Sequence, residues 1–111
     1  MHRLNRDIAS ILAASETQAT LAAPVVGSVA DAAGLRTGDT VLRAGVDAED
    51  LQDITSLDEL RWWILQQDTS PVYLEVQVQG KPTPHVVQLP ELPDDAISKE
   101  SNAWQARGFT G

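Results

Sequence analysis

A strand of strictly alternating apolar and polar residues, followed by a turn and a second strand, is the feature that most constrains the fold. The alternation gives this strand one apolar face, made of Val72, Leu74, Val76 and Val78. Pro71 begins the strand, residues 80–84 turn the chain, and His85–Leu89 is predicted to return beside it. The pattern therefore predicts a sheet with one buried face.

A capped helix is predicted over residues 57–67. Ser56 stands at the N-cap position, and Glu59 stands three residues later, where the partner residue of a capping box is found. Apolar residues at helical spacing form a stripe that should face the core, namely Leu57, Leu60 and Ile64. Trp63 flanks this stripe and Trp62 points about 100° away. We therefore expect Trp63 to be largely buried and Trp62 to be the more exposed of the two.

The elements before this helix complete a mixed α+β pattern. A strand is predicted over residues 24–29, a helical turn over residues 30–33 and a second strand over residues 40–44. Gly34 ends the helical turn, at a position where a positive φ is expected. Asp39 lies in the next turn, where its carboxylate can accept hydrogen bonds from backbone amides. The length of 111 residues fits one domain.

The charge composition excludes two classes of partner. The chain has 8 Lys and Arg against 16 Asp and Glu, a formal net charge of -8. Nucleic-acid binding needs a basic surface, so no nucleic-acid partner is expected, and an anionic membrane surface would repel the chain. An acidic run within residues 47–59 is interpreted as a solvated loop and the first turn of a helix, because it lacks the Asp spacing and central Gly of a calcium loop.

Residues that carry chemistry are scarce. The chain has no cysteine and two histidines, His2 and His85, which excludes Cys-ligated zinc and thiol nucleophiles. It also lacks the His-Glu-x-x-His helix of zinc proteases, the Gly-x-Ser-x-Gly elbow of serine hydrolases and a glycine-rich phosphate loop. We therefore expect no catalytic residue, no metal site and no cofactor in this chain.

One motif carries a resemblance to a known family. Ala33-Gly34-Leu35, two further residues and Gly38-Asp39 lie between two apolar strands. Together with the capped helix and the two strands after it, this order resembles a bacterial PDZ domain over residues 24–91. The resemblance implies an α+β fold of the PDZ-like kind, a partly open β-barrel or sandwich of about five strands capped by two helices. The arrangement would be the circularly permuted bacterial one, in which the closing strand comes last.

The resemblance divides the chain into three parts. Residues 1–16 are an N-terminal helical or flexible segment, residues 17–91 are the PDZ domain, and residues 92–111 are an acidic linker toward a following domain.

Two further runs narrow the resemblance, namely Pro24-Val25-Val26-Gly27-Ser28-Val29 and the tail Arg107-Gly108-Phe109-Thr110-Gly111. Both look like the N-terminal periplasmic PDZ domain of site-2-type intramembrane zinc metalloproteases that cleave anti-sigma factors. The resemblance implies a fragment of such a protease, a periplasmic domain of an inner-membrane protein. Its role would be substrate gating in regulated intramembrane proteolysis, not catalysis, with the zinc held by other segments. Its partners would be an extended peptide or a trimmed transmembrane substrate such as an anti-sigma factor, and a neighbouring second PDZ domain.

A peptide groove is expected between the strand near residues 17–22 and the helix over residues 57–67. PDZ domains bind an extended segment by adding it to a sheet edge. The candidate wall residues are Leu21, Ala23, Leu57, Arg61 and Ile64, of which Leu57 and Ile64 are equally compatible with the core. No glycine-rich loop precedes the strand to receive a carboxylate. A groove for an internal extended segment and a purely steric substrate filter therefore stay open.

Two other functions stay open as well. The chain is compatible with a PDZ interaction module of another bacterial envelope system, such as a secretion subunit or a periplasmic serine protease. It is also compatible with a structural scaffold that binds no peptide. A His-Glu-x-x-His inside an upstream apolar segment would favour the metalloprotease.

Overall fold

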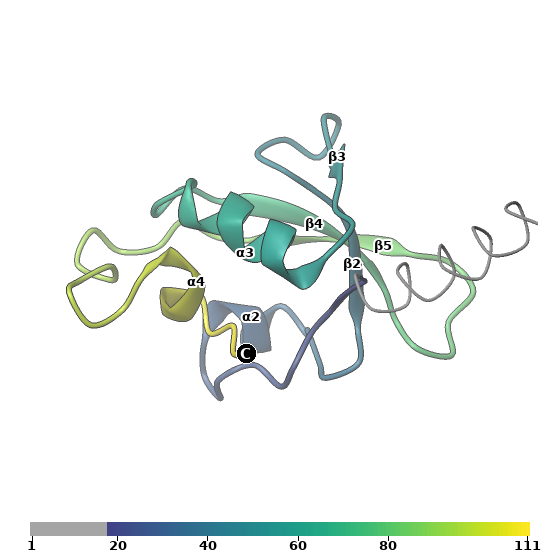
Figure 1. Ribbon diagram of the computed structural model, residues 1–111, viewed down its shortest axis with the longest axis horizontal. Helices are drawn as coiled ribbons and strands as arrows, with labels where there is room; N and C mark the ends of the chain where they lie inside the picture. The colour runs from purple at the N-terminus through teal and green to yellow at the C-terminus, as the bar shows by residue number, and fades with distance from the viewer. Residues whose placement is uncertain (1–17) are drawn as a thin grey trace, which may run out of the picture.

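The computed structural model describes residues 18–111, so the segment expected over residues 1–16 lies outside the described part. The described chain forms one antiparallel sheet and three helices, the predicted α+β arrangement (Figure 1). The strands are β1 (Ala19–Thr20), β2 (Thr40–Gly45), β3 (Gln52–Asp53), β4 (Val72–Gln77) and β5 (His85–Leu89). The helices are α2 (Val29–Ala32), α3 (Leu57–Leu65) and α4 (Ala103–Ala106).

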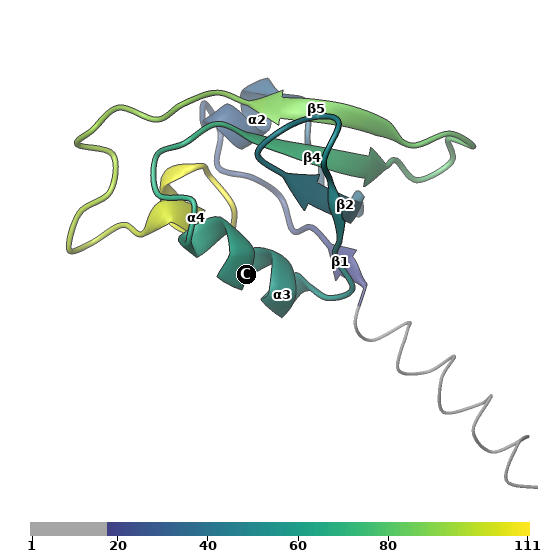
Figure 2. The ribbon, with the colours of Figure 1, turned by 90° about the horizontal axis from the view of Figure 1, so that it is seen from above.

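Strand β2 is the centre of the sheet. It pairs along one edge with β4, which in turn pairs with β5, and its other edge pairs with β1 at one end and β3 at the other. All four pairings are antiparallel. Helices α2 and α3 lie on opposite sides of the strands (Figure 2). The core therefore lies between the sheet and its helices.

The predicted hairpin is confirmed. Leu74 of β4 pairs with Val87 of β5, and the buried residues of β4 are the predicted apolar ones, Val72, Leu74 and Val76. On the other side of β4, strand β2 adds Val41 and Ala44 to the same core. A register shift in β2 just after Val41 brings these two residues, three positions apart, to one face.

Helix α3 begins at its predicted cap. Ser56 Oγ accepts a hydrogen bond from the Glu59 amide at 3.0 Å. The Glu59 carboxylate accepts from the Thr55 amide at 2.9 Å, one residue earlier than the capping box requires. Leu60 and Ile64 are fully buried, so the predicted stripe faces the core. The cap fixes where the helix starts and the stripe fixes how it is rotated.

The turn after α2 has the predicted geometry. Gly34 has φ of 89°, and the Arg36 amide donates to Asp39 Oδ2 at 3.0 Å. The same turn pairs with the residue after β1, because the Leu21 amide donates to the Asp39 carbonyl and the Gly38 amide donates to the Leu21 carbonyl. The turn therefore anchors the segment that leads into the candidate groove.

The strand predicted over residues 24–29 is wrong, because the strand lies earlier, at β1. Gly27 has φ of 84° and turns the chain there. The Ser28 hydroxyl donates to the Val25 carbonyl and accepts from the Asp31 amide, so Ser28 caps α2. Val26 is 91% exposed and has no sheet neighbour to cover it. A run of β-branched residues predicted a strand, and the glycine and the cap determine a turn.

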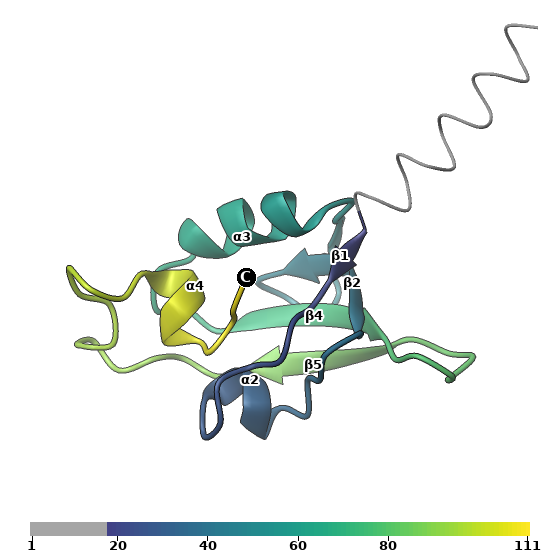
Figure 3. The ribbon, with the colours of Figure 1, turned by 60° about the horizontal axis from the view of Figure 1, so that its bottom comes forward.

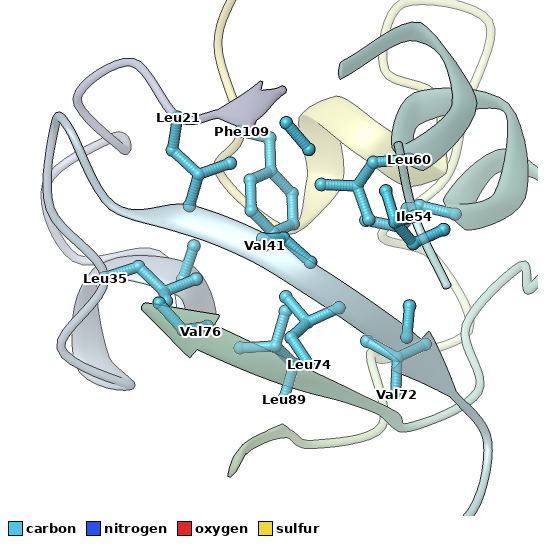
Figure 4. Packing of buried hydrophobic residues seen from close by; sticks show 14 of the residues in the cluster. Leu21, Leu35, Val41, Ile54, Leu60, Val72, Leu74, Val76, Leu89 and Phe109 are labelled. Atoms are coloured by element: carbon cyan, nitrogen blue, oxygen red, sulfur yellow. The ribbon is translucent and has the colours of Figure 1, made fainter. Parts of the chain in front are cut away.

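The acidic linker expected over residues 92–111 also needs correction for its second half. Residues 103–109 include α4 and contribute buried side chains to the domain, namely Ala103, Trp104, Arg107 and Phe109. Figure 4 shows the Phe109 ring among Leu21, Val41 and Leu60 of the core cluster. Burial of Trp104 and Phe109 removes a large apolar area from water. This gain in free energy holds the segment in place although most of the residues before it are polar. The segment is therefore built into this domain.

Candidate functional site

The C-terminal tail, residues 107–111, runs antiparallel to residues 23–25. The Val25 amide donates to the Gly108 carbonyl at 2.8 Å. Two residues away on each segment, Thr110 Oγ1 donates to the Ala23 carbonyl at 2.8 Å. In helix α2, the Ala30 amide donates to the Arg107 carbonyl at 3.0 Å. Residues 23–25 and the start of α2 thus hold residues 107–110 through both backbone and side-chain hydrogen bonds.

Helix α3 forms the opposite wall of this site. Figure 3 shows the end of the tail between α3 and the segment that joins β1 to α2. The Arg61 guanidinium donates to the Gly111 carbonyl and forms a 3.1 Å ion pair with Asp58. It also lies 5.5 Å from the centre of the Trp104 ring, within reach of a cation–π interaction. Arg61 therefore joins α3, α4 and the tail.

A cavity of about 490 Å³ opens beside the tail. Its lining comes from three places: Val25 before α2, Arg61 of α3, and residues from Glu100 to Gly111 around α4. The floor is aromatic, because the rings of Trp104 and Phe109 stack with centres 4.5 Å apart. The tail fills the site only in part.

The tail passes closest to its surroundings at Gly108. Gly108 has φ of 96°, and a Cβ built there would overlap the Cβ and Oγ atoms of Ser28. Gly111 also has a positive φ, but a Cβ there would meet nothing nearer than Leu57 Cδ2 at 3.9 Å. The site therefore excludes any side chain at one position of the bound segment and has room for one three residues later.

The five predicted groove residues divide into two groups. Ala23, Leu57 and Arg61 lie against the tail through the contacts described above. Leu21 and Ile64 are buried in the core, with 4% and 0% of their surface exposed, so they support the site from beneath. The tail thus contacts three of the five predicted wall residues, and it lies on residues 23–25, just beyond the strand segment over residues 17–22 where the groove was expected.

The tail side of the site was not predicted from the sequence. Asn102 and Gln105 form a full capping box, in which each side chain accepts from the backbone amide of the other residue. The run Asn102-Ala103-Trp104-Gln105 has the Asn-x-x-Gln spacing of a capping box and was a usable signal for α4. The acidic, polar residues ahead of it led to the linker interpretation instead.

Within residues 18–111, no three His, Asp or Glu residues come together as a group that could hold a metal ion. The zinc that the resemblance places in a parent protein therefore has no ligand set in this range. In that same range, no helix combines the length and the apolar composition needed to cross a bilayer.

Comparisons with known proteins assign no family to this sequence. No protein-family model matches the sequence, and no curated protein matches it.

Proposed function

We propose that this domain recognises an extended peptide by adding it to the edge formed by β1 and residues 21–25, beside α3, in the manner of a PDZ domain. The observation that carries the proposal is that residues 23–25 already bind residues 108–110 of the chain, in antiparallel order, through the Val25 amide and the Ala23 carbonyl. The α+β fold, with α3 beside the β1 edge, supports the same reading.

The setting we propose is a regulatory PDZ domain in the periplasm, part of a site-2-type intramembrane zinc metalloprotease. Peptide recognition there would gate the access of a trimmed transmembrane substrate, such as an anti-sigma factor, to a zinc centre in other segments. The support for this setting is the sequence pattern of residues 24–29 and the turn over residues 34–39.

Selection from a peptide library followed by NMR mapping tests the recognition step. The 111-residue chain should select extended peptides, and binding should shift the amide signals of residues 19–25 and of α3. Ala23→Pro should abolish binding, because the N–H of residue 23 points to the same side as the carbonyl that accepts from Thr110. Val86→Asp, an exposed position on β5, is the matched control and should bind normally.

Other results would favour other functions. Shifts confined to β5 would reject the proposed edge. Failure to select any peptide would favour a structural scaffold. The protease setting is tested in the parent protein, where Ala23→Pro should allow cleavage of an untrimmed substrate that the unchanged protein spares.

A further inference from the structure

We infer that residues 108–111 occupy the groove in place of a ligand, and that the external ligand is a segment of the same type: a glycine, an aromatic residue and a hydroxyl residue in succession. This inference rests on the proposed function, since it names the ligand class and the regulation of the same site. Each of the three positions is specified by a different contact.

The first position must be glycine. A side chain at Gly108 would overlap Ser28, which cannot move away because its hydroxyl caps α2 and donates to the Val25 carbonyl. The φ of 96° at this position also disfavours residues with a Cβ. A ligand with any larger residue here would lose the backbone bond to Val25.

The second position must be aromatic or of similar size. Phe109 is 5% exposed and belongs to the core cluster, stacked on Trp104. If the tail leaves, the space of Phe109 becomes an apolar void beneath the groove, and such voids are unfavourable. An incoming segment can displace the tail only if its own side chain fills that space.

The third position favours a hydroxyl. Thr110 Oγ1 donates to the Ala23 carbonyl, an outward acceptor of the sheet edge. Serine or threonine reproduces this bond, and a residue without a donor leaves the carbonyl to water. At the following position a Cβ on Gly111 would meet only Leu57 Cδ2, at 3.9 Å, but the φ of 100° disfavours residues with a Cβ there as well.

The tail and a ligand therefore compete for one site. A tethered segment acts at a high effective concentration, so an external peptide meets a site that is mostly closed. Its apparent affinity is reduced by the fraction of molecules with the tail released. The open cavity beside the tail, next to Arg61 and Trp104, offers an incoming segment its first contact.

The test uses the tail's own sequence as the probe. A fluorescent peptide with blocked ends and the sequence of residues 103–111 is titrated into the unchanged chain and into Phe109→Ala, with anisotropy as the readout. We expect Phe109→Ala to bind at least about tenfold more tightly, because its own tail no longer fills the site. Val86→Asp is the control and should bind the probe as the unchanged chain does, because this exposed β5 position makes no contact with residues 107–111.

Changes in the probe test the ligand class. Alanine in place of the probe's first glycine or its phenylalanine should each reduce the affinity for Phe109→Ala at least about tenfold, because the first change clashes with Ser28 and the second leaves the apolar space empty. If Phe109→Ala is unfolded alone, saturating probe should restore its circular dichroism and a cooperative melt. Failure to restore them would overturn the inference.

The outcomes separate this inference from the proposed function. Equal probe affinity for the unchanged chain and Phe109→Ala would overturn self-occupancy. If library peptides still bound the edge at residues 21–25 of both proteins, peptide recognition would stand without it. If neither the library nor the probe bound any variant, both ideas would fall.

Discussion

Gly34 and Gly108 both have positive φ, yet their surroundings differ. A Cβ at Gly34 would meet no atom within 4 Å, whereas a Cβ at Gly108 would overlap Ser28. Substitution at Gly34 therefore changes backbone strain alone, and substitution at Gly108 also changes packing. Variants of Gly34 therefore test the fold, and variants of Gly108 test the packing of the groove.

Gly34→Ala should lower the free energy of unfolding by about 1 kcal/mol, the cost of placing a Cβ residue in the left-handed region. Urea denaturation measures the change. Gly34→Asn is the control and should lose less, because Asn tolerates this conformation. An unchanged midpoint for Gly34→Ala would contradict the cap geometry at the end of α2.

Glu75 makes stability depend on pH. Arg43 on the neighbouring strand donates two hydrogen bonds to its carboxylate, at 3.0 and 2.7 Å. The hydrogen bond from Arg43 is the main cause that lowers the pKa of Glu75 below its usual value of 4.5, and the charge of Arg43 adds to it, while partial burial opposes it. A lowered folded-state pKa means that the pair stabilises the fold above pH 4.5 and loses this effect as pH falls through the folded-state pKa.

Glu75→Gln should therefore flatten the acid side of the stability profile. The unchanged chain should lose stability as pH falls below 4.5, and the variant should lose less over the same range. Urea midpoints measured across the acid range decide this. Parallel profiles for the two proteins would show that the pair does not contribute. Because Arg43 is solvent-accessible, the difference should shrink at high salt.

At the scale of elements, α3 separates a core face from a solvent face. Trp62 is 67% exposed, whereas Trp63 is partly buried and packs against the core cluster. The sequence-based order of the two residues is thus confirmed. Both follow from the stripe that Leu60 and Ile64 bury.

Trp63→Ala should lower the free energy of unfolding by about 2–3 kcal/mol, less than the loss at fully buried aromatic positions because Trp63 keeps some exposure. Trp62→Ala on the next residue is the matched control and should cost well under about 1 kcal/mol. Chemical denaturation of both variants measures the difference. A larger loss for Trp62→Ala would mean that the helix faces are assigned wrongly.

Local signals predicted some elements and missed others for identifiable reasons. The cap at Ser56, the alternation from Val72 and the turn at Gly34 are each set by neighbouring residues, so they could be predicted. The strand expected over residues 24–29 failed because Gly27 and the Ser28 cap turn the chain there, and because the bond that Val25 makes to Gly108 joins residues far apart in sequence. Single-sequence patterns do not show such distant partners.

For the molecule as a whole, Arg107 fastens the tail to the sheet domain. It has no exposed surface, and its guanidinium donates to the Ala103 carbonyl at 2.9 Å and to the Ser70 carbonyl at 2.5 Å. Burial lowers the pKa of Arg107 from its usual value, and the charge of Asp68 opposes the shift. The buried guanidinium is therefore held by one carbonyl of α4 and one carbonyl just before β4, and it joins the tail to the sheet.

Arg107→Ala should lower the free energy of unfolding on the order of 3 kcal/mol, because it removes a buried side chain and both bonds. Arg36→Ala is the control: that side chain is 61% exposed in its pair with Asp31, so its loss should cost about 0–1 kcal/mol. Thermal melts of both variants make the comparison. Similar small losses would show that the tail docks without this residue.

The candidate site could be half predicted. Ala23, Leu57 and Arg61 were placed at the groove from the expected fold, and they lie together against the tail. Their occupant was missed, because acidic residues such as Asp94 and Asp95 gave the segment the composition of a linker. The free energy gained by burying Trp104 and Phe109 in the core docks this segment, although its composition is that of a linker.

The pairing of Ala23 with Thr110 also sets an order of assembly, because it joins residues 87 positions apart. Contacts that close so long a loop form late, after the β4–β5 hairpin and α3 have formed from near neighbours. The Phe109 side chain therefore joins the core beside Leu21 and Leu60 in a late step, and until then these two residues lack the cover that it gives them (Figure 4).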